Sequence, residues 1–264
     1  MTFGRSDDMK YISHLDMMRF WERALRRAEI PVSYSEGFSP HAQISLAAPL
    51  AVGTTSEAEL MDVFLDKPMA PKQLIQQVTQ QLPAGITIIV AQEVGLALPS
   101  LQADIRFAEY VVDIEEFAGA GPAGAGETAR APAAATAATA DSATTDASAP
   151  PQYVPPSHSS ATAEAAVTTF LAATTIPWQH KRENDIRSYD IRGQVEDISV
   201  EHSDDRGARL HMRLKNDNTG SGRPEQVIAA LGLPPPTRIH RTKLILENSS
   251  PAREAWRARG RASE

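Results

Sequence analysis

Residues 11–41 read YISHLDMMRFWERALRRAEIPVSYSEGFSPH and decide the fold of the first half of the chain. Ser13 is a good helix N-cap with Asp16 three residues later, and apolar residues then recur at every third or fourth position. This pattern predicts a helix over residues 13–28, which Pro31 ends. The predicted buried stripe of that helix consists of Leu15, Met18, Trp21, Leu25 and Ala28.

Working outward, the apolar patterns predict the order strand, helix, strand, strand, helix, strand in each half of the chain. In the first half, the strands are predicted at 9–12 (with Phe3 in its earlier part), 32–35 with 43–47, 57–65 and 86–93, and the second helix at 71–82. In the second half, strands are predicted at 107–114, 186–200, 208–214 and 238–246, and helices at 163–174 and 224–231. This order indicates an α+β fold of two ferredoxin-like βαββαβ units, with antiparallel sheets and helices on one face.

One segment differs in composition from the rest of the chain. Residues 118–161 consist mostly of Ala, Gly, Pro, Thr and Ser and show no apolar periodicity. Such a segment cannot bury enough apolar surface to offset its chain entropy, so we expect a disordered insertion. The expected organisation is a first unit at 1–106, the first strand of the second unit at 107–117, the insertion at 118–161, the rest of the second unit at 162–247 and a disordered Arg-rich tail at 248–264.

The composition excludes several classes of site. The chain has no cysteine, which excludes disulfides, thiol catalysis and Cys-ligated zinc or iron–sulfur clusters in this polypeptide. No apolar run approaches the ~20 residues that a membrane-spanning helix needs, so we expect a cytoplasmic protein without membrane contact. The formal net charge of -7 gives no support to a nucleic-acid partner, although residues 181–264 carry 16 Lys and Arg against 13 Asp and Glu.

The helix over 13–28 carries a candidate binding face. Asp16, Arg19, Arg23 and Arg27 recur every three or four residues and share one face. Forked guanidinium groups could bind phosphates there. The alternative is an ordinary solvated face, stabilised by pairs such as Glu22–Arg26 at i,i+4.

The glycine turn after the helix carries aromatic residues. Gly37 and Pro40 are typical of a turn, and Tyr34 and Phe38 beside them could stack on a planar group such as a base. The alternative is that Phe38 belongs to the core. We expect the start of the helix and the turn to converge on one pocket for an anionic, planar ligand. The candidate ligand-binding residues are His14, Asp16, Arg19, Arg23, Arg27, Tyr34, Gly37, Phe38 and His41.

Two histidines are candidate catalytic residues. His14 and His41 could act as acid and base, and the alternative for His14 is a surface histidine beside the helix cap. His14 followed by Asp16 does not match the His-x3-His spacing of a helical zinc site, so no metal site is predicted. Ser13 and His14 are adjacent on a helix and point about 100° apart, so they do not form a nucleophile–base pair.

The N-terminal pattern resembles the bacterial radical-SAM-linked family, a domain of unknown function encoded beside, or fused behind, radical S-adenosylmethionine proteins. The residues that carry the resemblance are Phe3, Arg5, Lys10, Tyr11, Ser13, His14 and Asp16, then the run 23–28 (RALRRA), then Pro31, Tyr34, Ser35, Gly37, Phe38, Pro40 and His41. Weaker matches follow at Lys181, Arg182, Asp190, Arg223 and Pro224. The resemblance implies a radical SAM partner that holds the iron–sulfur cluster and S-adenosylmethionine, with no cofactor in this chain.

Three functions are compatible with these residues. The first is an accessory protein, not an enzyme on its own, that presents a substrate such as RNA or a ribosomal component to the radical SAM partner. The second is an RNA-processing or hydrolytic enzyme that uses His14 and His41. The third is a scaffold whose arginines only solvate its surface.

Overall fold

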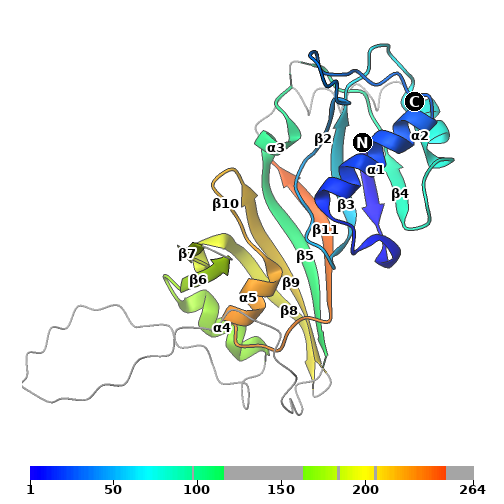
Figure 1. Ribbon diagram of the computed structural model, residues 1–264. Helices are drawn as coiled ribbons and strands as arrows, with labels where there is room; N and C mark the ends of the chain where they lie inside the picture. Colours follow the sequence, from blue (N-terminus) through cyan, green and yellow to red (C-terminus); the bar gives the residue numbers. More distant parts are fainter. Residues whose placement is uncertain (97, 116–162, 183–184, 205–206, 248–264) are drawn as a thin grey trace, which may run out of the picture.

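The structure is a computed structural model that describes residues 1–96, 98–115, 163–182, 185–204 and 207–247. It contains helices and strands in a mixed α+β arrangement around one large sheet (Figure 1). The predictions of disorder for 118–161 and 248–264 lie outside the described residues.

The first half contains four strands and two longer helices. In chain order these are β1 (Thr2–Arg5), a 3-10 turn (Asp7–Met9), α1 (His14–Arg27), β2 (Ile44–Leu46), β3 (Thr55–Val63), α2 (Pro71–Thr79) and β4 (Ile86–Val90). The strands pair in the order β4-β1-β3-β2, and every pair is antiparallel. Pro71 at the start of α2 lacks an N–H that a first helical turn would leave unbonded.

The second half has the same succession, with a small hairpin added. Its elements are α3 (Leu101–Asp104), β5 (Ile105–Glu115), α4 (Ala163–Ala172), β6 (Pro177–Arg182), β7 (Asp185–Asp190), a 3-10 turn (Arg192–Gln194), β8 (Val195–Asp204), β9 (Gly207–Asp217), β10 (Gly220–Ser221), α5 (Pro224–Ala230) and β11 (Arg238–Leu246). The main strands pair antiparallel in the order β11-β5-β9-β8. The β6–β7 hairpin forms a separate two-stranded sheet.

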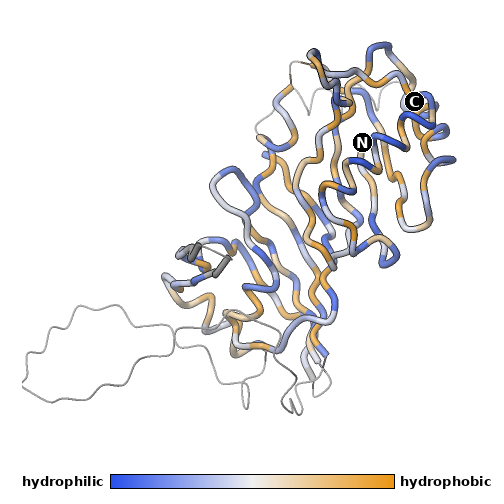
Figure 2. Tube along the Cα trace, viewed as in Figure 1, coloured by the Kyte–Doolittle hydropathy of each residue, from blue (hydrophilic) through white to orange (hydrophobic). Residues whose placement is uncertain are grey.

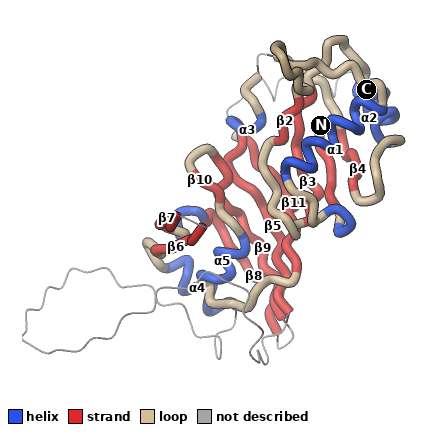
Figure 3. The backbone as a smooth tube through the Cα atoms, in the orientation of Figure 1, coloured by secondary structure: helices blue, strands red, loops and turns tan. Residues whose placement is uncertain are grey.

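The two halves share one nine-stranded sheet rather than the separate sheets that the sequence predicted. The last strand, β11, pairs parallel with β3 of the first half through His240 opposite Thr55 and Arg241 opposite Ser56. The pairing involves two residues on each strand, so this seam between the halves is short. Helices α1, α2, α4 and α5 lie on one face of the sheet, and the described residues leave most of the other face uncovered (Figures 1 and 3).

Each half buries its own core between helices and sheet. In the first half Trp21 of α1 packs edge-on against Phe3 of β1, with ring centroids 4.9 Å apart. In the second half Phe170 of α4 and Val227 of α5 pack on alternate residues of the sheet, among them Leu210. Figure 2 shows hydrophobic residues gathered along the strands, as a sheet that is covered on one face requires.

The predicted helix over 13–28 is confirmed, but the prediction of which residues form its buried face was partly wrong. Leu15 is 67% exposed and Met18 is only partly buried, whereas Met17 and Ala24 are buried beside Trp21. Apolar residues at both sets of positions satisfy a spacing of three to four, so periodicity alone could not choose between them. Contact with the sheet selected the face of Met17, Trp21, Ala24, Leu25 and Ala28.

Three predicted strands differ from the structure in extent, and two of them lie in the first half. Residues 9–12 are not a strand, because the chain leaves the sheet after β1 and turns at Asp7–Met9. Residues 32–35 make only isolated bridges, Val32 with Leu65 and Tyr34 with Ala42.

The predicted strand over 186–200 is divided into β7 and β8. The Asp190 side chain accepts backbone hydrogen bonds from Ile176 N at 2.8 Å and Arg192 N at 3.0 Å. These bonds stabilise a turn, so the chain changes direction before β8 begins at Val195.

Candidate functional site

The start of α1 is fixed by a side-chain cap. Ser13 Oγ accepts a hydrogen bond from Asp16 N at 3.2 Å, and the Asp16 carboxylate accepts one from Ser13 Oγ at 2.7 Å. Asp16 Oδ1 also lies 3.4 Å from Arg19 Nη1. The predicted capping pair is therefore confirmed. His14, the first helical residue, is exposed beside this cap.

The exposed side of α1 carries the arginines that the sequence placed there. Arg19, Arg23, Arg26 and Arg27 are all exposed, and Arg23 Nε donates to the backbone oxygen of Arg19 at 3.2 Å. Within the described part of the chain, no carboxylate lies within ion-pair distance of Arg23, Arg26 or Arg27. This side of α1 therefore presents cationic groups that the described residues do not neutralise.

The segment 31–43, which joins α1 to β2, ends in an exposed aromatic tip. Ser35 and His41 close its neck, since Ser35 N donates to His41 O at 2.9 Å and His41 N donates to Ser35 Oγ at 3.0 Å. Gly37 has a φ of 121°, a backbone conformation that favours glycine. Phe38 beside it is 109% exposed and Tyr34 is 43% exposed, so Phe38 is not part of the core.

The structure does not bring the nine candidate residues into one pocket. Strands β1 and β2 both pair antiparallel with β3 and so run in the same direction. His14 follows the end of β1, whereas His41 precedes the start of β2, so the order and direction of these strands place the two histidines at opposite ends of this half. Helix α1 spans the distance between these ends with 14 residues, about 20 Å at 1.5 Å per residue. The expected convergence on one pocket is therefore wrong.

The candidates instead form two groups. His14, Asp16 and Arg19 lie at the N-terminal end of α1. Arg27, Tyr34, Gly37, Phe38 and His41 lie at its C-terminal end and in the segment that follows, and Arg23 lies one turn before Arg27. We call the second group, with Arg23 and Arg26, the cationic–aromatic surface.

A buried ion pair at the seam was not predicted from the sequence. Arg241 of β11 is fully buried, and its guanidinium donates to the Glu59 carboxylate of β3 through Nε at 2.9 Å and Nη2 at 2.6 Å. Burial alone would lower the Arg241 pKa, but Glu59 and Tyr110 outweigh that cost and raise it above its usual value. Arginine and glutamate in strands usually face solvent, so only the three-dimensional contact between β3 and β11 identifies this pair.

A second buried arginine organises the loops at one end of the first half. Arg5 is 3% exposed and donates to backbone oxygens of Ala51 at 2.8 Å, Thr54 at 2.6 Å and Ile12 at 3.4 Å. Burial lowers the Arg5 pKa, an effect that Glu59 partly offsets. Arg5 therefore has a structural explanation: it holds together the loops before α1 and before β3.

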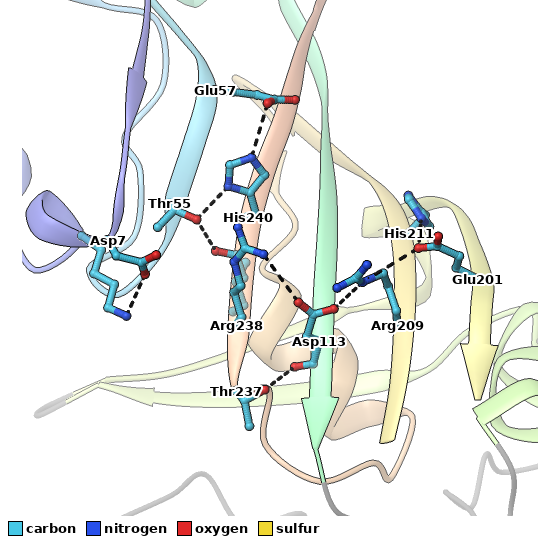
Figure 4. A network of polar contacts seen from close by, with 12 residues as sticks. Asp7, Thr55, Glu57, Asp113, Glu201, Arg209, His211, Thr237, Arg238 and His240 are labelled. Carbon is cyan, nitrogen blue, oxygen red and sulfur yellow. Dashed lines mark hydrogen bonds and ion pairs between the residues drawn. The ribbon is translucent and has the colours of Figure 1, made fainter. Parts of the chain in front are cut away.

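The uncovered sheet face carries a network of charged side chains (Figure 4). Asp113 of β5 lies 2.6 Å from Arg209 Nε of β9 and 3.9 Å from Arg238 Nη1 of β11. The Asp113 backbone oxygen also accepts from Thr237 Oγ1 at 3.2 Å. Strand alternation predicts that these residues face away from the core, but it does not reveal their partners.

Two histidines belong to the same face. His240 Nδ1 lies 2.7 Å from Thr55 Oγ1, and its Nε2 lies 3.8 Å from Glu57 (Figure 4). His211 Nε2 lies 3.1 Å from Glu201. The Thr55 residue is 3% exposed, so a substrate could not reach its hydroxyl, and we assign no catalytic role to it.

A cavity of about 750 Å³ opens at the end of the first half of the sheet. It is lined mainly by apolar side chains from β3, α2, β4, β11, residues 91–96 and residues 98–101, among them Leu60, Phe64, Val90, Leu96 and Ile245. None of the nine candidate residues lines it. The apolar runs of the sequence indicated strands here, but they did not indicate a cavity between them.

Two kinds of feature are absent from the described residues. No group of three or more His, Asp or Glu residues is arranged there to hold a metal ion, and the sequence offers no cysteine. None of the described helices has the length and apolar character needed to span a membrane.

Comparison with known proteins identifies one family. The model of a family described as "Uncharacterized protein conserved in bacteria (DUF2344)" matches residues 1–224. No curated protein matches the chain. A chain in the crystal structure of a Cbf5-Nop10-Gar1 complex is similar at a TM-score of 0.43 and 7% sequence identity. The similarity covers 92% of this chain and 48% of the solved chain, so this chain spans about half of that chain's length.

Proposed function

The chain belongs to the bacterial family of uncharacterized proteins DUF2344, and we propose that it acts there as a recognition subunit and not as an enzyme on its own. Its cationic–aromatic surface would bind an anionic, planar ligand, with RNA as the substrate class. The subunit would present this substrate to a partner enzyme. The resemblance of the N-terminal pattern to the radical-SAM-linked family suggests a radical SAM enzyme, whose cluster and S-adenosylmethionine would then lie on the partner.

One observation carries this proposal. Three exposed arginines without a carboxylate partner in the described residues, Arg23, Arg26 and Arg27, precede a closed turn that exposes Phe38 completely. A buried Phe38 would be explained by packing, but a fully exposed phenylalanine gains nothing from folding. Guanidinium groups bind phosphates, and an aromatic ring stacks on a base, so the two together suit single-stranded RNA.

The fold supports the same interpretation. We propose that the two halves are ferredoxin-like units, because each pairs its four main strands antiparallel in the order fourth, first, third, second. The fold by itself does not define a function. It does, however, provide a rigid sheet on which α1 and the turn 35–41 are held.

The alternative enzyme is less well supported by the geometry. Acid–base cleavage of RNA would need both His14 and His41 within hydrogen-bond reach of one phosphate. His14 lies after the end of β1 and His41 before the start of β2, and because these strands run in the same direction, the two histidines are too far apart to act on one phosphate. His14→Ala should therefore bind RNA as the unchanged protein does, His41→Ala should bind it no more tightly because His41 belongs to the cationic–aromatic surface, and none of the three proteins should cleave it. Cleavage by the unchanged protein that either variant abolishes would favour the enzyme.

RNA binding tests the recognition surface. The probe is a fluorescein-labelled single-stranded RNA of mixed sequence, and fluorescence anisotropy reports its binding. Arg23→Ala/Arg27→Ala should weaken binding clearly, and Phe38→Ala should cost ~1–3 kcal/mol. The control Lys72→Ala/Arg213→Ala removes two positive charges from other exposed positions and should change binding little. Equal losses in both double variants would mean that only overall charge matters and would contradict the proposal.

Affinity capture from the native host tests the partner. The tagged protein should recover a radical SAM enzyme, identified by mass spectrometry. Recovery of RNA without such an enzyme would support the recognition surface but contradict the assignment of the partner.

A further inference from the structure

The exposed side of α1 carries a row of three arginines at a regular spacing. Arg19, Arg23 and Arg27 are exposed and lie four residues apart. In an α-helix, each step of four residues advances about 6 Å along the axis and about 40° around it. The row therefore turns through about 80° from its first to its last arginine and stays on one side of the helix. Its spacing is close to the separation of successive phosphates in an extended single strand of RNA.

The three guanidinium groups differ in their partners. Arg23 Nε donates to the backbone oxygen of Arg19 at 3.2 Å, which directs the Arg23 side chain back along the row, and no described residue binds its two Nη groups. Arg27 forms no ion pair with the described residues. Arg19 Nη1 lies 3.4 Å from Asp16 Oδ1, and both of these side chains are more than half exposed. Two members of the row are thus available to a ligand, and the third is shared with a carboxylate.

Acidic residues limit the net charge of this surface. Helix α1 carries four arginines against Asp16 and Glu22, a net charge of +2. Glu29 and Glu36 follow in the next segment, so the surface as a whole has little net charge. A broad positive field is therefore not what would hold RNA here. Binding instead requires a ligand whose individual phosphates match the positions of the guanidinium groups.

The exposed ring of Phe38 lies beyond one end of the row. The segment 31–43 follows the C-terminal end of α1, where Arg27 is the last helical residue. Two hydrogen bonds between Ser35 and His41 close the neck of the turn that carries Phe38. Aromatic side chains stack on bases that are unpaired in the ligand. The ring thus favours a single strand over a duplex, and it marks the Arg27 end of the row as the end where a base is bound.

We infer that this surface binds a segment of four nucleotides of single-stranded RNA along α1, an inference that rests on the proposed function of the same surface. Three successive phosphates, which link four nucleotides, pair with Arg27, Arg23 and Arg19. The base at the Arg27 end stacks on Phe38. The phosphate at Arg19 replaces the contact with Asp16, so the Asp16 carboxylate competes with the ligand there and weakens the binding of the fourth nucleotide.

Competition measures the length of the bound segment. Unlabelled oligouridylates of two, three, four and five nucleotides, without terminal phosphates, compete with the fluorescein-labelled RNA for the full chain. Their affinity should rise at least fivefold from two to three nucleotides and again from three to four, because each step adds a phosphate that meets an arginine. The fifth nucleotide should add only the statistical gain of a second register.

Two variants identify the arginine that binds the last phosphate. Arg19→Ala should weaken binding of the tetranucleotide at least fivefold, to the affinity of the trinucleotide, and leave the trinucleotide unchanged. Asp16→Asn removes the competing charge but keeps an oxygen that can accept from Ser13 Oγ, so it should tighten binding of the tetranucleotide and not of the trinucleotide. The control Lys72→Ala, at an exposed position on α2, should change neither.

Several results would overturn the inference. They are equal affinities for two and four nucleotides, a fifth nucleotide that adds as much as the fourth, equal losses at every length in Arg19→Ala, or no effect of Asp16→Asn on the tetranucleotide. Each of these results includes RNA binding, so the proposed function would stand. Failure of every RNA to bind would contradict the proposed function together with this inference.

Discussion

Replacing Glu59 by leucine should destabilise the protein strongly, because it leaves the Arg241 guanidinium buried without its carboxylate partner. Arg241 is fully buried and Glu59 is 4% exposed, so water cannot replace the lost contact. Without Glu59, the Arg241 guanidinium keeps its side-chain hydrogen bond with Tyr110 and the backbone oxygens of Pro49 at 3.3 Å and Ala48 at 3.4 Å, both long for hydrogen bonds to a cation, and none of these partners carries a negative charge. The same reasoning applies to Arg241→Met, which leaves the Glu59 carboxylate buried.

The magnitude follows from the burial of both charges. Removing one partner of a buried ion pair costs about 3–5 kcal/mol, whereas replacing both partners by apolar residues is often neutral. Glu59→Leu and Arg241→Met should each lower the free energy of unfolding by about 3–5 kcal/mol. The double variant should be more stable than either single variant. The exposed pair Glu109–Arg213 provides a control, whose removal should cost only about 0–1 kcal/mol.

Urea denaturation measures these differences. Tryptophan fluorescence reports Trp21 in the first half together with Trp178 and Trp256, and circular dichroism reports the whole chain, so agreement of the two transitions would support two-state unfolding. If Glu59→Leu costs less than about 1 kcal/mol, the pair is hydrated in solution and the account of the seam is wrong. A double variant less stable than both single variants would also contradict the reasoning.

Three other perturbations test the fold. Leu25→Ala should lower the free energy of unfolding by ~2–5 kcal/mol because Leu25 is buried, whereas Leu15→Ala should change it by less than about 0.5 kcal/mol. Similar losses for both variants in urea denaturation would mean that the wrong face of α1 was assigned to the core. Burial raises the pKa of Tyr110, so its neutral form stabilises the fold below the unfolded pKa of ~10, and this contribution is lost as the pH rises through the folded pKa. Tyr110→Phe should therefore flatten the alkaline part of a stability–pH curve, and an unchanged slope would contradict this. Partial burial opposes ionisation of Asp217, but hydrogen bonds from Thr219 outweigh it and lower the Asp217 pKa. This carboxylate thus stabilises the fold above the unfolded pKa of ~3.9 and less as the pH falls through the folded pKa, so Asp217→Asn should reduce acid sensitivity in the same urea assay.

The sequence predicted most local elements because their signals are local. The cap of Ser13 and Asp16, Pro71 at the start of α2 and Pro224 at the start of α5 each mark a helix within a few residues. Strand β11 was predicted at 238–246, the range that the structure gives. These features depend only on residues close to one another in the chain, so a single sequence is enough to predict them.

The predictions that failed concern features that depend on contacts between distant segments of the chain. Leu15 fits the helical period as well as Met17 does, and only the position of the sheet decides which one is buried. The pairing of β11 with β3 joins residues more than 180 positions apart, so it could not be read from either strand. The buried pair of Glu59 and Arg241 is a consequence of that pairing.

The candidate site shows the same division. Arg23, Arg27 and Phe38 are exposed, which a binding surface requires and which a solvated face shares for the arginines, so ligand binding at these residues stays a prediction. The prediction that His14 and His41 meet in one pocket was wrong, because it assumed that residues close in the sequence are also close in space. A helix of 14 residues between them spans the unit from one end to the other.

The salt dependence of RNA binding tests the recognition surface most directly. For single-stranded nucleic acid, the logarithm of the binding constant falls with the logarithm of salt concentration with a slope of about -0.7 for each phosphate neutralised. If Arg23 and Arg27 each contact a phosphate, Arg23→Ala/Arg27→Ala should make this slope shallower by about 1.4, and Phe38→Ala should weaken binding without changing the slope. An unchanged slope in the double arginine variant, with the change appearing instead in Lys72→Ala/Arg213→Ala, would contradict the assignment of this surface.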